Sequence, residues 1–388
     1  MDEKLPEHVD VIVLGTGLPE AILASACSRS GLSVLHLDRN EYYGAEWSSF
    51  NLTSIKEFLQ EDQNLPTTSQ DLLEKLKTSP EENIVLLGNR EIIGEKKAEW
   101  IREEFEEQLK DRYRRFSIDV LPKVLLSRGA MGMKACCDFM DSVGHFGPSP
   151  FLFPLYGCGE LSQCFCRLAA VFGSLYCLGR PVQALVYDKQ NRVCAVIADN
   201  QRINCDRIIM SAKYVPEIYK PGKSENIERI CYITDKSILK GEKEHISLIN
   251  IASLRANSQI SRIIEAGFEV FTAPKGFYLV HATGSSEDST SNLEDLLLKI
   301  FEQNEIEPIW RLKFDIKSLS FDEKNIEFPE NLTISPNCDA FIHYSKVIDQ
   351  CREIFCGIWP DRDFLPRSIK KEEEEAEEEA EDETENIE

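Results

Sequence analysis

The segment formed by residues 9–50 constrains the fold more than any other part of the chain. Residues 9–14 are apolar with one exception and rich in β-branched side chains, which is typical of a strand buried on both faces of a parallel sheet. Gly15 and Gly17 follow at once and permit a tight turn. Residues 18–30 have the pattern of a helix that ends at the next glycine.

A second strand, predicted over residues 34–37, completes a β-α-β unit and ends at Asp38. An acidic residue about twenty positions after a glycine turn is typical of the opening unit of a dinucleotide-binding fold. The sequence therefore predicts an α/β protein with a Rossmann-like domain of the FAD/NAD(P)-binding type and a parallel sheet. Further strand-like runs between residues 182 and 316, beginning with a hairpin, predict a subdomain with a mixed or antiparallel sheet.

The glycine turn itself argues against a bound nucleotide. A dinucleotide-binding turn has the pattern Gly-x-Gly-x-x-Gly, and here Glu20 stands at the third glycine position. A carboxylate in the first helical turn suits the helix dipole but repels the pyrophosphate that would bind there. We therefore expect no cofactor, with Gly15, Gly17 and Asp38 as vestiges of such a site. The alternative is a flavin-dependent oxidoreductase, which would need a small residue in place of Glu20.

The charge of the chain limits its partners. The 388 residues have a net charge of -23, and residues 370–388 alone contain twelve acidic residues and two lysines. The rest of the chain is still acidic, which disfavours binding to nucleic acid or to an anionic membrane and favours a basic protein partner. The tail is a low-complexity segment that cannot form a core.

Three further features indicate a protein of the cytosol. The first ten residues are charged and lack the apolar core of a signal peptide. No apolar run reaches transmembrane length. The thirteen cysteines are scattered, without the spacing of a metal site or a redox pair, so we expect reduced thiols and no bound metal.

The helix predicted over residues 160–175 carries two rows of side chains. One row is apolar and is expected to face the core: Leu161, Phe165, Leu168 and Phe172. The other row is polar and is either a solvated face or a recognition surface: Glu160, Gln163 and Arg167. Residues 96–115 predict a second, highly charged helix with a single apolar stripe.

Residues 41–47 form an aromatic loop that includes Tyr43 and follows the second predicted strand. Ligands and partners of such folds bind at this end of the strands, so the loop is either a recognition element or simply a packed loop.

Four segments of the chain resemble the Rab escort proteins, component A of Rab geranylgeranyltransferase, and their relatives the Rab GDP-dissociation inhibitors. They are residues 10–49, 115–128, 149–178 and 231–284. The sequence Gln163-Cys164-Phe165-Cys166-Arg167 is more similar to the escort branch than to the inhibitor branch.

The resemblance implies a non-catalytic protein of the cytosol that uses no flavin. It would bind GDP-bound Rab GTPases, present them to the alpha/beta dimer of Rab geranylgeranyltransferase, and deliver them to membranes by transient contact. In relatives, the Rab-binding platform uses the tyrosine of the Tyr-Tyr-Gly loop and the polar row of the later helix. The matching positions here are Tyr43, Glu160, Gln163 and Arg167.

The chain departs from the family pattern near residues 131–132, where members of the family carry a helical domain and this chain continues directly. We therefore expect this domain to be largely absent. In the family it shields the isoprenoid and, in escort proteins, docks the prenyltransferase, so both functions are expected to be impaired. A degenerate scaffold that folds poorly is the third hypothesis. The predicted divisions are residues 1–60 (β-α-β unit), 61–114 (variable charged insertion), 115–369 (remainder of the Rab-binding domain) and 370–388 (disordered acidic tail).

Overall fold

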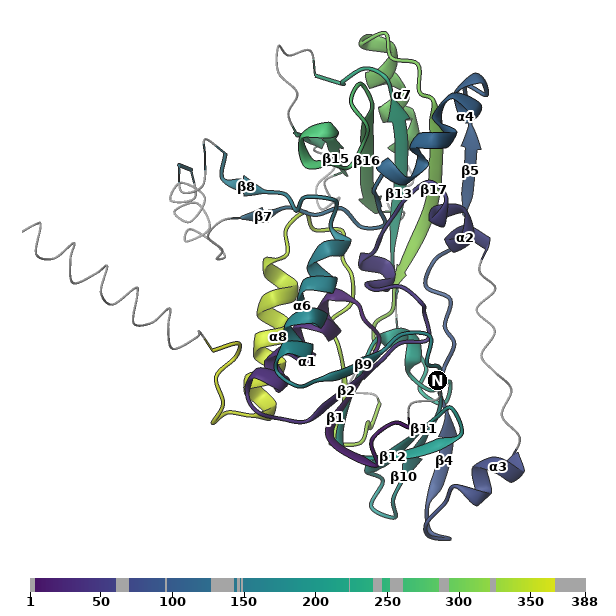
Figure 1. Cartoon of the computed structure of the whole chain (residues 1–388), viewed down its shortest axis with the longest axis vertical. Helices are drawn as coiled ribbons and strands as arrows, with labels where there is room; N and C mark the ends of the chain where they lie inside the picture. The colour runs from purple at the N-terminus through teal and green to yellow at the C-terminus, as the bar shows by residue number, and fades with distance from the viewer. Residues whose placement is uncertain are drawn as a thin grey trace, which may run out of the picture.

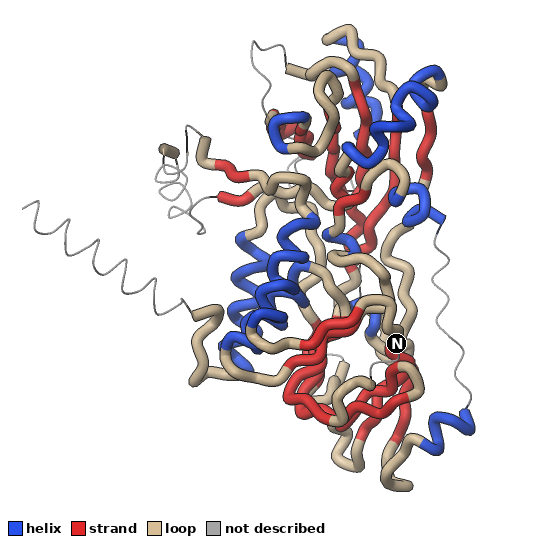
Figure 2. The backbone as a smooth tube through the Cα atoms, in the orientation of Figure 1, coloured by secondary structure: helices blue, strands red, loops and turns tan. Residues whose placement is uncertain are grey.

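The computed structural model describes residues 4–60, 70–94, 96–126, 143–144, 147, 149–222, 224–239, 246–251, 261–285, 293–321 and 326–366. Two sheets lie one above the other along the long axis of the molecule, and a group of helices lies beside them (Figures 1 and 2). The predicted junction at residues 131–132 and the predicted tail at 370–388 lie outside the described residues.

The first sheet contains the predicted β-α-β unit and has the strand order β4-β10-β11-β12-β1-β2-β9, with β18 paired to β12. Strands β1, β2, β9, β12 and β18 are parallel, whereas β4, β10 and β11 are antiparallel to their neighbours. The predicted α/β class with a Rossmann-like parallel sheet is therefore confirmed. The bounds are β1 (His8–Leu14), β2 (Val34–Leu37), β4 (Asn83–Leu86), β9 (Leu175–Cys177), β10 (Val182–Tyr187), β11 (Val193–Ala198), β12 (Gln201–Met210) and β18 (Leu332–Ile334).

The second sheet is antiparallel throughout, in the order β14-β15-β16-β13-β17-β5, as the strand-like runs predict. Helix α7 (Leu293–Gln303) covers it with the buried side chains of Leu297 and Phe301. The strands are β5 (Lys97–Trp100), β13 (Glu225–Thr234), β14 (Ser247–Ile251), β15 (Ser261–Ala266), β16 (Tyr278–Ser285) and β17 (Trp310–Ser318).

The prediction of a helix over residues 96–115 is wrong in its first part. Strand β5 occupies residues 97–100, and helix only follows as α4 (Glu104–Leu109) and the 3-10 helix η2 (Lys110–Arg115). Trp100 pairs with Trp310 across the edge of the second sheet, and Glu99 forms an ion pair with Arg311. These long-range partners outweigh the local helical pattern.

Helices α1 (Leu18–Arg29), α6 (Gly159–Val171) and α8 (Ser345–Ile358) form the group beside the sheets (Figures 1 and 2). The prediction that the apolar row of α6 faces the core is confirmed only in part, since Leu161 and Phe165 are half-buried against the core. The buried positions of this helix are small residues: Gly159, Ser162, Cys166 and Ala169. Small residues allow α6 to approach α1 so closely that the Ser25 hydroxyl donates to the Phe165 carbonyl at 2.6 Å. Of the larger side chains in the row, Phe172 at the end of the helix is 46% exposed.

Short elements connect these layers. They are η1 (Ala45–Trp47), β3 (Ser49–Phe50), α2 (Ser54–Gln60), α3 (Gln70–Lys75), β6 (Ile118–Asp119), β7 (Leu125–Leu126), β8 (Phe151–Leu152), η3 (Ala212–Tyr214) and η4 (Phe268–Val270). Strands β7 and β8 pair with each other and flank the segment that contains the predicted junction. No helix in the described part of the chain is long and apolar enough to cross a membrane.

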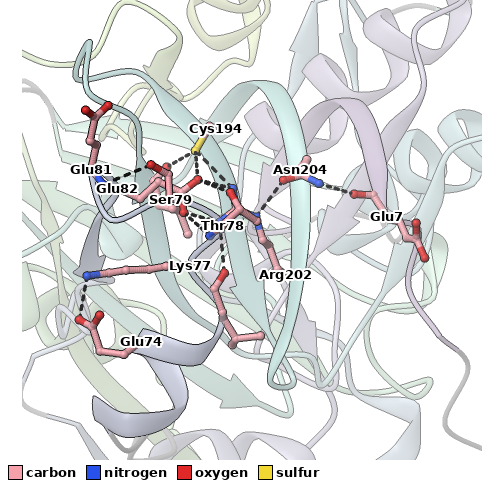
Figure 3. A network of polar contacts seen from close by, with 12 residues as sticks. Glu7, Glu74, Lys77, Thr78, Ser79, Glu81, Glu82, Cys194, Arg202 and Asn204 are labelled. Atoms are coloured by element: carbon pink, nitrogen blue, oxygen red, sulfur yellow. Dashed lines mark hydrogen bonds and ion pairs between the residues drawn. The ribbon is translucent and has the colours of Figure 1, made fainter.

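Arg202 of β12 anchors the chain that precedes β4 (Figure 3). Its guanidinium forms two hydrogen bonds of 2.9 Å to the carboxylate of Glu82, which also accepts hydrogen bonds from the backbone and hydroxyl of Thr78. Burial acts to raise the pKa of Glu82, but the hydrogen bonds from Arg202 and Thr78 outweigh it and lower the pKa to about 2. The segment predicted as a variable insertion is thereby tied to the first sheet.

We predict that Glu82→Gln destabilises the protein at neutral pH by about 1–3 kcal/mol, the usual contribution of hydrogen bonds to a charged group. Because folding lowers the pKa of Glu82, its contribution is complete above about pH 4.5 and is lost as the pH falls toward 2. Urea unfolding at pH 7 and pH 3.5 measures the difference. Glu81→Gln is the control, since the side chain of Glu81 is 66% exposed and its ion pair with Lys189 is long, at 3.8 Å. Equal stabilities of the two variants at pH 7 would contradict the prediction.

Candidate functional site

The carboxylate of Asp38 is buried at the end of β2 and is fully engaged by the protein itself. It accepts hydrogen bonds from the backbone and hydroxyl of Thr16, both at 2.7 Å, from the Tyr214 hydroxyl at 2.9 Å and from the Asn40 backbone at 3.0 Å. Burial disfavours ionisation, but the charge of Lys213 and these hydrogen bonds outweigh it, so the pKa of Asp38 lies below its usual value. No oxygen of Asp38 remains free for a ribose.

Glu20 fills the space beside the glycine turn. Its side chain is 2% exposed, accepts a hydrogen bond from the Ser335 hydroxyl, and lies where a Cβ on Gly17 would project. Burial and the neighbouring Glu46 raise the pKa of Glu20 to about 8. A buried carboxyl group thus stands where the fold would hold a pyrophosphate. The residues of this turn therefore do not fit a flavin or a nicotinamide dinucleotide.

The same cluster positions the aromatic loop. The Thr16 hydroxyl, which donates to Asp38, accepts a hydrogen bond of 3.1 Å from the backbone of Gly44. Gly44 has a φ of 92°, and a Cβ there would meet the backbone of Ser48 at 3.1 Å, so the turn requires glycine. The adjacent Tyr43 is half-buried with its ring 5.8 Å from that of Tyr176. Burial and Tyr176 raise the pKa of Tyr43 above its usual value.

The first turn of α6 is held by a buried acid. Asp119 accepts hydrogen bonds from the Ser49 hydroxyl and from the backbone of Cys158 at 2.7 Å. The Ser49 hydroxyl in turn accepts a hydrogen bond of 2.7 Å from the backbone of Gly159. Gly157, at a φ of 104°, has no space for a Cβ because oxygens of Asp119 and Ser49 lie 2.7 Å from that position. Burial raises the pKa of Asp119.

These supports surround a pocket of about 500 Å³ between residues 41–51, α2 and the first turns of α6. Three of the four predicted Rab-binding residues line it, namely Tyr43, Glu160 and Gln163. Arg167 is not part of the lining; it lies exposed further along α6. The structure thus brings three predicted residues together at one cavity and places the fourth on the same helix.

Two further acidic residues line this pocket, Glu41 and Glu57, and neither is predicted as a site residue from the sequence. Glu41 belongs to the aromatic loop, which the sequence does single out, but Glu57 lies on α2, whose sequence has no distinguishing pattern. Its place opposite α6 depends on tertiary packing alone. Within the described residues, no group of three or more His, Cys, Asp or Glu could hold a metal ion.

Comparisons with known proteins agree on one family. A model of the GDP dissociation inhibitor family matches residues 1–73 and 131–365. Rab proteins geranylgeranyltransferase component A 1 of Caenorhabditis elegans is 44% identical over 96% of this chain and 97% of its own length. The human protein of the same name is 25% identical over 94% of this chain and 93% of its own length.

The fold is also found among solved structures. The crystal structure of the Rab GDI of Plasmodium falciparum matches 92% of this chain and 99% of its own, with a TM-score of 0.65 and 19% identity. The alignment with the Caenorhabditis elegans protein spans 502 positions, more than the 388 residues of this chain. That relative therefore has segments without a counterpart here.

We predict that Glu20→Gln changes how stability depends on pH. Folding raises the pKa of Glu20 from 4.5 to about 8, so the folded state holds a proton that the unfolded state releases. The free energy of unfolding should therefore fall as the pH rises between these values. Since a tenfold difference in proton affinity corresponds to about 1.4 kcal/mol, the variant should gain a few kcal/mol over the parent above pH 8. Near pH 4.5 it should gain almost nothing.

Urea unfolding at a series of pH values tests this prediction. Glu225→Gln, at an exposed position of β13, is the control that should follow the parent protein throughout. Parallel pH profiles for Glu20→Gln and the parent would show that Glu20 is ionised in the folded protein.

Proposed function

The chain belongs to the GDP dissociation inhibitor family, and from this premise we propose that it is a Rab escort protein. It binds GDP-bound Rab GTPases, presents them to Rab geranylgeranyltransferase and accompanies them to membranes. The observation that carries the proposal is the 44% identity, over nearly the whole chain, with a protein named as component A of that transferase. The chain is a non-catalytic accessory component and works from the cytosol.

The Rab-binding surface consists of Tyr43, Glu160, Gln163 and Arg167. The shared pocket of the first three residues supports this assignment. Arg167 lies seven positions after Glu160 on α6, so both belong to the same side of the helix. Its side chain is exposed, and no ion pair engages it within the described part of the chain. A partner can therefore reach the guanidinium without first breaking an internal contact.

The helical domain of the family is missing from this chain at residues 131–132. Two observations support this proposal: the surplus length of the alignment with the Caenorhabditis elegans relative, and the pairing of β7 with β8 on the two sides of the junction. Because each buried CH₂ of a lipid contributes about 0.8 kcal/mol, loss of the isoprenoid pocket removes much of the hold on the prenylated product. Docking of the transferase is impaired as well, because the same domain docks it in the escort proteins.

Arg167→Glu is expected to abolish Rab binding while leaving the fold intact. Removing one partner of a buried interfacial charge pair costs about 2–5 kcal/mol, and the reversed charge adds repulsion to this loss, so no saturable binding is expected. The measurement is calorimetric titration of the purified chain with one unprenylated Rab, loaded with GDP and separately with GTP. Saturable binding that prefers GDP is expected from the parent chain. Arg114→Glu, at an exposed position of η2, is the control. Unchanged affinity of Arg167→Glu would refute the assigned surface.

A prenylation assay tests the missing domain. With transferase, geranylgeranyl diphosphate and GDP-bound Rab supplied, this chain should support prenylation at least about tenfold less well than the Caenorhabditis elegans relative, since a loss of about 1.4 kcal/mol already weakens binding tenfold. Insertion of the relative's segment between residues 131 and 132 should restore activity. Full escort activity of the unmodified chain would reject the proposal.

A further inference from the structure

The pocket beside α6 has acidic walls. Glu41 from the aromatic loop, Glu57 from α2 and Glu160 from α6 line it, whereas lysine and arginine are absent from the lining. None of these three carboxylates is engaged in an ion pair within the described part of the chain. The pocket is therefore a cavity with carboxylates on several sides and no lysine or arginine in its lining.

Aromatic rings form another part of the lining. Tyr42 meets Phe50 edge to face at 4.9 Å, and Phe50 stacks on Phe58 at 4.7 Å between ring centroids. The ammonium of Lys96 lies 5.4 Å from the centroid of Phe58, so this cluster already accepts one cation from the protein itself. Aromatic faces combined with carboxylates are the surroundings that ammonium and guanidinium groups prefer.

A buried carboxyl group lies directly behind the wall. Asp119 is 1% exposed, and its Oδ1 accepts the hydrogen bond from Ser49, which lines the pocket. Its second oxygen, Oδ2, is buried and has no hydrogen-bond partner among the described residues. Through Ser49, Asp119 therefore fixes part of the pocket wall.

We propose that this pocket binds one basic side chain, a lysine or an arginine, presented by the GTPase partner. The proposal rests on the proposed function and adds Glu41 and Glu57 to the recognition surface. A volume of about 500 Å³ is sufficient for one long side chain with accompanying water. Tyr156, which also lines the pocket, is 56% exposed and stacks on Phe271 at 5.1 Å, so it extends the apolar wall beside the entrance.

The pocket and Arg167 together define a charge pattern for the partner. Glu160 and Arg167 are seven residues apart on α6, which corresponds to about 10 Å along a helix. A partner that inserts a basic side chain into the pocket must therefore offer an acidic group about 10 Å away for Arg167. These two contacts of opposite charge determine the orientation of the partner as well as its binding.

The experiment is titration of the full chain with one GDP-loaded, unprenylated Rab at several salt concentrations. Glu57→Gln should weaken binding about tenfold, and Glu41→Gln with Glu57→Gln more strongly, with a shallower dependence of affinity on salt than the parent. Glu302→Gln, an exposed helical carboxylate on α7, is the matched control and should bind as the parent does. Thermal unfolding confirms that each variant folds.

A charge exchange identifies the inserted residue. Lysines and arginines of the Rab are changed to glutamate one by one, and one of these variants should bind weakly to the parent chain but recover with Glu57→Lys. If Arg167→Glu abolishes binding while Glu57→Gln and the double variant keep the parent affinity and salt dependence, the pocket proposal is overturned and the proposed function stands. If the folded parent chain fails to bind GDP-loaded Rab, both are overturned.

Discussion

The arrangement of the aromatic loop and of the glycine turn depends on the buried carboxylate of Asp38. In a dinucleotide-binding fold an acid at this place meets the ribose of the cofactor. Here it is satisfied by Thr16, Tyr214 and the backbone of Asn40, and through the Thr16 hydroxyl it holds Gly44 of the aromatic loop. A carboxylate that would suit a ribose instead joins the glycine turn to the aromatic loop.

Glu20 completes this conversion. A glycine at its position would leave room at the start of α1, whereas the buried carboxyl group occupies that room and hydrogen-bonds to Ser335 across the molecule. The sheet therefore has the topology of a dinucleotide-binding fold, whereas the residues of its glycine turn do not fit the cofactor. Single side chains such as Glu20, rather than the topology of the sheet, therefore decide what this fold can bind.

Much of the fold could be predicted from the sequence, because residues 9–38 alternate between strand, glycine turn, helix and strand in a pattern with few other solutions. The polar row of α6 could also be predicted from the helical spacing of its residues. The buried face of the same helix could not, because counting apolar residues ignores how closely small residues such as Ser162 and Ala169 let α1 approach. Residues 97–100 have a helical pattern but pair with β17, and Glu57 joins the pocket only through packing. Both depend on partners distant in sequence.

The pairing of β7 with β8 brings the two ends of an intervening segment to one point. A chain that leaves and returns at the same place can lengthen or shorten without altering the path of either sheet. The entropic cost of closing such a loop grows only with the logarithm of its length, about 0.6 kcal/mol per doubling. Because β7 and β8 hold both ends of the segment together, insertions of different lengths between them would leave both sheets in place.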